Sequence, residues 1–126
     1  MRKTVYASHS RNFDSKKELY EPLRQSELNE KYRIILPHEE NERPFNSKYL
    51  LMNDCELMIA EISYPSSGVG IEIGWADAFG VPIILAHKKN IKMSGSLSRI
   101  VSFKLEYENT NDLIQKLEEV FKKRHF

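Results

Sequence analysis

Apolar and polar positions divide the chain into short apolar runs that alternate with segments of helical spacing. Runs rich in apolar and β-branched residues predict strands at residues 4–7, 32–36, 57–62, 83–85 and 103–107. The segments between them carry apolar residues three or four positions apart, which is typical of helices with one buried face. Five strands alternating with helices predict a three-layer α/β domain in which helical crossovers join parallel strands.

The first two helical segments have recognisable starts. Ser15 forms a capping-box pattern with Glu18, and the later Pro22 predicts a kink or a second helix start. Residues 37–44 are polar and bounded by prolines, so an irregular loop is expected there. After it, Ser47 is the expected cap of a short helix that leads into the central strand.

The last helix has the clearest pattern. Asn109 or Thr110 is its expected cap. Its apolar face consists of Leu113, Ile114, Leu117, Val120 and Phe121. Two pairs at i,i+4, Glu118–Lys122 and Glu119–Lys123, are expected on its exposed side. A brief helix is also expected at residues 97–101.

The stretch from residue 57 to residue 85 predicts the unit that organises the domain. An apolar strand is followed by the turn residues 64–68 and by a helix over residues 69–79. Gly80 ends this helix and Pro82 prevents its continuation, before the next buried strand begins. This order is a βαβ unit, and ligands of such units bind outside the carboxyl ends of the strands.

Composition and charge exclude several classes of function. At 126 residues, with 40% hydrophobic and 29% charged residues, the chain is expected to form one globular domain over residues 1–126. A net charge of +1 argues against partners such as a nucleic acid polymer or an acidic membrane. The sequence shows no signal-peptide core and no long apolar span. Cys55 is the single cysteine and is interpreted as a packing residue, which favours a cytoplasmic location.

Glu72 is the candidate reactive group. It lies about one turn into the helix that follows the turn residues 64–68, at the edge of the sheet where ligands bind. A carboxylate near a helix N-terminus tends to stay ionised, which suits a nucleophile or a group that stabilises a cation. The alternative is that Glu72 only complements the helix dipole.

No cofactor or metal is predicted. Gly68, Gly70 and Gly74 are similar to the dinucleotide fingerprint, but the spacing is one residue too long and the unit is not the first of the chain. No phosphate-loop lysine follows them. The four histidines show no zinc-ligand spacing with one another or with Cys55.

Several polar residues near the same edge allow two interpretations. Glu61 ends an apolar strand and either faces the pocket or braces a loop, with bracing preferred. His9 and His38 follow strand ends and either line the pocket or are ordinary exposed loop residues. Ser66 and Ser67 either cap the helix or bind an anion with its free N–H groups.

A phosphate or another compact anion is the expected ligand group. Three segments are predicted to meet at the sheet edge: residues 66–68 at a helix N-terminus, residues 8–12 with Arg11, and the basic loop with Lys88 and Lys89. Serine hydroxyls can donate to anion oxygens. For the lysine loop by itself, a solvated turn is the preferred interpretation.

The segment AEISYPSSGVGIEIG at residues 60–74, followed by GVPI at residues 80–83, resembles the signature of the nucleoside 2-deoxyribosyltransferase superfamily. The resemblance is closest to the branch of 2'-deoxynucleoside 5'-phosphate N-hydrolases. It implies a flavodoxin-like three-layer sandwich with a five-stranded parallel sheet in the order 2-1-3-4-5. It also implies an enzyme that forms a homodimer and acts on a small nucleoside or nucleotide.

The resemblance also implies roles for individual residues. Glu72 matches the nucleophile that attacks the anomeric carbon of the sugar, and Tyr6 matches a catalytic tyrosine. Substrate and phosphate binding is implied for Ser10, Arg11, Ser66, Gly68, Gly70 and Ser98. Ser98, within a Leu-Ser pair, is implied to reach the site of the neighbouring subunit.

The chain departs from the family pattern at two places. At the position where the hydrolases carry an aspartate, this chain has Lys48, and the nearest acidic residue is Asp54. At the position of the family's loop arginine, this chain has Asn12, and Arg11 is one residue before it. The resulting hypothesis is a cytoplasmic N-glycosidase for (deoxy)nucleoside 5'-monophosphates or related nucleotides. Base exchange between deoxynucleosides and a catalytically silent nucleotide-binding module are the alternatives.

Overall fold

A five-stranded sheet in the order β2-β1-β3-β4-β5 forms the centre of the fold. The computed structural model describes residues 2–39, 45–92, 95–100 and 103–126. The strands are β1 (Thr4–His9), β2 (Arg33–Ile35), β3 (Leu57–Glu61), β4 (Ile83–Lys88) and β5 (Phe103–Tyr107). All four neighbouring pairs are parallel. The predicted fold class and strand order are therefore confirmed.

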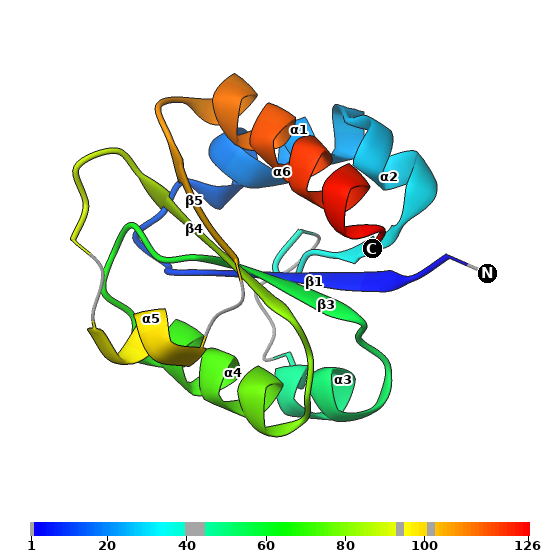
Figure 1. The fold of residues 1–126 in the computed structure, drawn as a ribbon, viewed down its shortest axis with the longest axis vertical. Helices are drawn as coiled ribbons and strands as arrows, with labels where there is room; N and C mark the ends of the chain where they lie inside the picture. Colours follow the sequence, from blue (N-terminus) through cyan, green and yellow to red (C-terminus); the bar gives the residue numbers. More distant parts are fainter. Residues whose placement is uncertain (1, 40–44, 93–94, 101–102) are drawn as a thin grey trace.

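Helices cover both faces of the sheet, as Figure 1 shows. The helical elements are η1 (Lys16–Tyr20), α1 (Glu21–Gln25), α2 (Glu27–Lys31), α3 (Ser47–Asn53), α4 (Ser67–Ala78), α5 (Gly95–Ile100) and α6 (Thr110–Arg124). In Figure 1, α1, α2 and α6 lie above the sheet, and α3, α4 and α5 lie below it. No helix within the described residues is both long and apolar enough to cross a membrane.

The alternation of side chains along the strands divides the core in two. Leu57 and Ile59 of β3 pack in the cluster under α1, α2 and α6, whereas Met58 and Ala60 pack in the cluster with α3 and α4. All of β3 is buried, as its unbroken apolar run predicts. Because β1 also alternates, Tyr6 belongs to the α4 side of the sheet and Val5 and Ala7 to the α6 side.

Helix α4 has the boundaries that its turn residues favour. Ser66 caps it, because its Oγ accepts a hydrogen bond from the Val69 N–H at 3.3 Å. Gly80 follows the helix with a φ of +74°, a conformation that glycine adopts without strain. Val69, Ile73 and Ala76 are buried against the sheet. The carboxyl end of β3 is thereby joined to a helix whose N-terminus lies at the same edge.

Of three predicted helix starts, two differ from the structure. Ser15 does not cap a helix, because it is itself helical and the Glu18 N–H donates to the Asp14 carbonyl at 2.9 Å; the π-helical turn η1 follows from Lys16. The second start at Pro22 is confirmed, since α1 begins at Glu21 with the proline in its first turn. Helix α3 is capped by Asn46 rather than by Ser47, which is buried in its first turn.

Later elements differ from their predictions in smaller ways. Strand β4 extends to Lys88, so His87 and Lys88, which were predicted to begin a loop, belong to the sheet. Helix α5 begins at Gly95, and residue 101 lies outside the described residues. Asn109 is the cap of α6. Among described residues, this helix forms the ion pair Asp112–Lys116 and not the two predicted pairs. The Lys116 ammonium also donates to the Glu106 carbonyl at 2.5 Å, whereas an exposed pair without a further partner gains little against side-chain entropy.

Candidate active site

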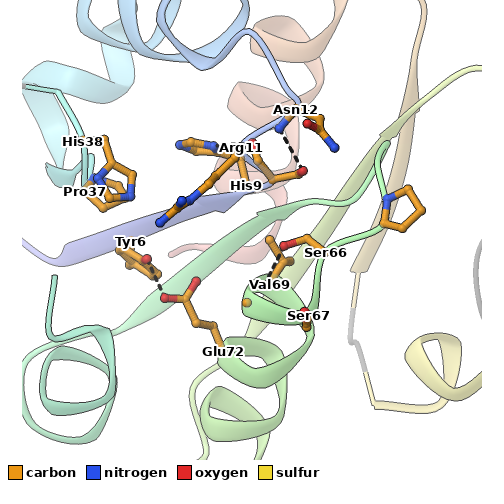
Figure 2. Close-up of a pocket in the computed structure, with 13 residues that line it drawn as sticks. Tyr6, His9, Arg11, Asn12, Pro37, His38, Ser66, Ser67, Val69 and Glu72 are labelled. Carbon is orange, nitrogen blue, oxygen red and sulfur yellow. Dashed lines mark hydrogen bonds between the residues drawn. The ribbon is translucent and has the colours of Figure 1, made fainter. Parts of the chain in front are cut away.

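A cleft of about 680 Å³ opens at the carboxyl edge of the sheet. Its walls come from β1 and the loop after it, from residues 37–38 after β2, and from the segment that leads into α4. Figure 2 shows these three segments around a common space. Of the predicted site residues, the cleft is lined by Tyr6, Ser10, Arg11, Ser66, Gly68 and Glu72. His9 and His38 also line it, so the pocket interpretation holds for both histidines.

The Glu72 carboxylate is held by two hydroxyl donors from β1. Tyr6 Oη donates to Oε2 at 2.8 Å, and Ser8 Oγ donates to Oε1 at 2.5 Å. Tyr6 and Ser8 are two residues apart on one strand, so their side chains point to the same face, toward α4. Figure 2 shows the carboxylate directed at Tyr6 and toward the cleft. Ser8 was predicted only as part of the loop at residues 8–12 and not as a partner of Glu72, although its period-two spacing from Tyr6 is visible in the sequence.

Tyr6 is fixed as a hydrogen-bond donor by its surroundings. Burial raises the pKa of its phenol above the ordinary value, and the negative charge of Glu72 raises it further. Its ring stacks on Phe45, with centroids 5.7 Å apart and planes inclined by 15°. A phenol that retains its proton keeps donating to Glu72, so the carboxylate stays oriented.

The N-terminus of α4 supplies the opposite end of the cleft. Pro65, Ser66, Ser67 and Gly68 line it there. The first N–H groups of a helix have no intrahelical partner, and the helix dipole adds partial positive charge at this end. An anion is the natural ligand of such a position. Gly70 does not line the cleft; it borders a separate cavity of about 80 Å³ on the side of Leu97.

The loop after β1 adds polar groups to the same space. The buried hydroxyl of Ser10 accepts a hydrogen bond from the Asn12 N–H at 3.1 Å. Arg11 extends across the cleft toward Tyr6 in Figure 2, and Asn12 lies on the Ser66 side. Arg11 and Asn12 both line the cleft, so the departure from the family pattern leaves an arginine at the site.

The predicted contribution of Lys88 and Lys89 to the cleft is wrong. Lys88 forms an ion pair with Glu18 at 3.0 Å and lies over the rings of Phe13 and Tyr64. Lys89 pairs with Glu108 at 3.3 Å. Because β4 extends through Lys88, both ammonium groups are directed to partners on the α6 side of the sheet.

Glu61 braces the loop between β3 and α4. It is 1% exposed, and its carboxylate accepts hydrogen bonds from the Ser63 N–H at 2.6 Å, from Ser63 Oγ at 2.8 Å, and from the Tyr107 hydroxyl. Ser63 Oγ in turn accepts from the Lys88 N–H at 2.8 Å. The buried carboxylate is therefore satisfied by donors, and the preferred interpretation of Glu61 is correct.

Ser98, Lys48 and Cys55 lie away from the cleft. Ser98, in α5, donates to the Gly95 carbonyl at 2.8 Å. Lys48 lies 5.8 Å from the centre of the Trp75 ring. The thiol of Cys55 donates to the Leu57 carbonyl, and burial raises its pKa to about 11, which fits a packing residue. Within the described residues, no group of His, Cys, Asp and Glu could hold a metal ion.

Known proteins are similar to this chain in sequence and in fold, although no family model matches it. The "Putative 2'-deoxynucleoside 5'-phosphate N-hydrolase 1" of Thermofilum pendens is 29% identical over 79 residues, which are 59% of this chain. The chain is similar to an N-hydrolase of the expected branch. The predicted resemblance is confirmed. The matched region spans 55% of the length of that relative.

A solved structure has a similar fold. The structure of Clostridium botulinum CMP N-glycosidase, BcmB, superposes with a TM-score of 0.71 and covers 94% of this chain and 99% of that one. The two sequences are 23% identical, so this likeness establishes the fold alone. The chain therefore has the same flavodoxin-like fold as that protein.

Proposed function

We propose that this protein hydrolyses the N-glycosidic bond of nucleoside 5'-monophosphates, with the Glu72 carboxylate as nucleophile. The observation that carries the proposal is the fixed geometry of Glu72: both of its oxygens accept hydrogen bonds from β1 hydroxyls, and the group lies in the cleft. The sequence similarity to an N-hydrolase supports the same class of reaction.

The chemistry of the bond explains why a held carboxylate is useful. Cleavage of an N-glycosidic bond develops positive charge on the sugar ring. A carboxylate that is already oriented stabilises this charge without reorganisation and can then bond to the anomeric carbon. Water hydrolyses the resulting ester in a second step. Tyr6 and Ser8 hold the two oxygens throughout.

The substrate phosphate is assigned to the N-terminus of α4. Ser66, Ser67 and Gly68 offer hydroxyl and N–H donors there, one and a half turns before Glu72. Binding energy from a group remote from the reacting bond positions the sugar against the nucleophile. A nucleotide is therefore the expected substrate, in preference to a free nucleoside.

The function is tested with a panel of ribonucleoside and deoxyribonucleoside 5'-monophosphates and the corresponding nucleosides. Free base and sugar phosphate are measured by chromatography, with and without a second base. Base release that needs no second base supports hydrolysis. Product that forms only with the second base supports base exchange, and saturable binding without product supports a nucleotide-binding module.

Glu72→Gln is expected to lower kcat by at least about 100-fold, because the amide can neither attack nor stabilise the cation by charge. Substrate affinity is expected to persist, since the amide oxygen still accepts from Tyr6 or Ser8. Asp77→Asn is the matched control, because Asp77 is an exposed carboxylate on the same helix outside the cleft. Wild-type turnover by Glu72→Gln would exclude the mechanism.

A further inference from the structure

The geometry of a nucleotide divides the cleft into two ends. In a nucleoside 5'-monophosphate the base is attached at C1' and the phosphate-bearing C5' at C4', the two ring carbons that flank the ring oxygen, so the base and the phosphate extend from opposite ends of the sugar. With the phosphate at Ser66–Gly68 and the sugar over Glu72, the base extends toward the far wall. Figure 2 shows that this wall carries Pro37 and His38, on the side of Glu72 opposite to Ser66 and Ser67. This assignment rests on the proposed function.

A chain of hydrogen bonds fixes the backbone of this wall. The His38 N–H donates to Tyr20 Oη at 3.3 Å, and Tyr20 Oη lies 2.6 Å from His9 Nε2. His9 Nδ1 lies 3.0 Å from the Ser10 carbonyl oxygen, which can only accept, so Nδ1 carries the proton. His9 Nε2 then accepts from the Tyr20 hydroxyl. The end of β1, the turn η1 and residue 38 are thereby tied together.

His9 is neutral in this arrangement and has no proton to give to a ligand. Burial lowers the pKa of its imidazole below the ordinary value, and the nearby His38 lowers it further. Its single N–H is used by the Ser10 carbonyl, and its other nitrogen is used by Tyr20. His9 is therefore a positioning residue for the wall.

The other groups of the cleft are also unsuited to proton transfer. The phenol of Tyr6 has a raised pKa and donates to Glu72, on the nucleophile's side of the sugar. The guanidinium of Arg11 does not release its proton in proteins. The hydroxyl of Ser10 is buried and accepts from the Asn12 N–H. Each of these groups can bind or orient, but none can donate a proton to a departing base.

His38 differs from these groups in its exposure and in the hydrogen bonding of its side chain. Its side chain is exposed in the cleft, and its ring meets the ring of His9 at 77°, with centroids 6.4 Å apart. Its hydrogen bond to Tyr20 is made by the backbone N–H. Within the described residues, neither ring nitrogen of His38 forms a hydrogen bond. Imidazole is the side chain that most often serves as a general acid or base in enzymes.

We propose that His38 is the general acid that protonates the leaving base. As the Glu72 oxygen bonds to C1', the C1'–N bond breaks, its electron pair goes to the base, and the imidazolium of His38 gives its proton to that base. Neutral His38 then accepts a proton from the water that attacks C1'. The Glu72 ester bond breaks, and the products are the neutral base and the sugar phosphate.

The test compares two leaving groups on the same sugar phosphate. The nucleotide that the panel identifies as the best substrate carries a base that departs poorly without a proton. The 4-nitrophenyl glycoside 5-phosphate of the same sugar releases 4-nitrophenolate, which needs none. His38→Gln is expected to lower kcat/KM, which reports only the steps up to departure of the leaving group, about 100-fold or more for the nucleotide, as loss of a general acid does. For the nitrophenyl compound, we expect a change of less than about three-fold.

The controls separate this inference from the proposed function. Tyr20→Phe keeps His38 but removes the hydroxyl that fixes its backbone, so a smaller loss, confined to the nucleotide, is expected. His125→Gln, an exposed histidine at the end of α6, is expected to keep wild-type rates with both compounds. Equal losses by His38→Gln on both compounds, or no loss on either, would overturn the role of His38 while hydrolysis stands. Absence of turnover by the wild-type protein would overturn the proposed function itself.

Discussion

Two glutamates at one sheet edge serve different purposes because of the side chains around them. Glu61 is closed off from solvent, and every hydrogen bond it accepts comes from within the fold. Glu72 accepts from Tyr6 and Ser8 on one side and faces the cleft on the other. The first carboxylate is therefore a brace for the loop before α4, and the second is placed to meet a ligand.

His9 is expected to make stability depend on pH. Its pKa is lowered in the fold by burial and by His38, although the Ser10 carbonyl and Glu72 oppose the shift. Because the unfolded chain binds the proton more readily, the stabilisation is complete above the unfolded pKa of about 6.5 and is lost as pH falls through the folded pKa. The free energy of unfolding, measured in urea, should therefore fall between pH 7.5 and pH 5.

His9→Gln should show a smaller fall over the same pH range, because the buried titrating group is gone. His125→Gln, which removes an exposed histidine, should keep the full wild-type dependence. Parallel pH profiles for His9→Gln and the wild-type protein would show that the titration of His9 does not contribute. Tyr20, His38 and Glu72, which surround His9, are present in all three proteins, so a difference between the pH profiles reports the loss of His9.

The N-terminus of helix α4 is capped by a side chain of the fold and also lines the cleft. The cap at Ser66, the buried positions Val69 and Ile73, and the end at Gly80 determine where it begins, which face it buries and where it stops. Because β3 leads directly into this helix, the free N–H groups fall at the carboxyl edge of the sheet.

Ser66→Ala should affect both stability and substrate choice. Loss of the cap is expected to lower the free energy of unfolding by about 1 kcal/mol. Loss of the hydroxyl at the anion position should also reduce the preference for a nucleotide over its nucleoside, measured as a ratio of kcat/KM.

Asn109→Ala is the matched control, because Asn109 caps α6 through the Asp112 N–H at 2.9 Å, away from the cleft. It should lose similar stability and leave the substrate preference unchanged. A wild-type preference for the nucleotide in Ser66→Ala would remove Ser66 from the phosphate site. Equal use of the two substrates by the wild-type protein would favour base exchange.

On the scale of the whole molecule, the two covered faces of the sheet differ. The α3–α4 side carries the exposed apolar side chains Tyr49, Met52 and Ile71, which are 58%, 52% and 53% exposed. We expect this side to meet a second copy of the chain, because exposed apolar groups on neighbouring helices favour association. Ser98, on α5 of the same side, is then available to the partner's site, as the resemblance implies.

Sedimentation at micromolar concentration should therefore show a dimer. Met52→Lys, which places a charge among these apolar side chains, should shift the protein toward monomer, whereas Lys116→Glu on α6 should not. If subunits exchange, a mixture of Glu72→Gln and Ser98→Ala proteins should regain activity that neither has alone. A wild-type monomer of full activity would exclude shared sites.

The order of strands and helices was determined by local patterns in the sequence. The apolar run before the turn residues 64–68 became β3, the spacing after Ser66 became α4, and Asn109 became the cap of α6. These features depend on residues a few positions apart, whose geometry repeats in every helix and strand. Glu72 could be identified as a candidate for the same reason. Its place near the start of a helix, and the place of that helix start at the carboxyl edge of the sheet, both follow from the order of strands and helices.

Only the tertiary structure decided which side chains meet. Tyr6 and Ser8 reach Glu72 from more than sixty positions away, and the backbone of His38 is held through Tyr20 to His9. Lys88, whose position in the sequence suggested an anion site, pairs with Glu18 instead. The partners of a polar group depend on which faces of distant elements pack together and on how far each strand extends. Periodicity along the chain does not contain that information.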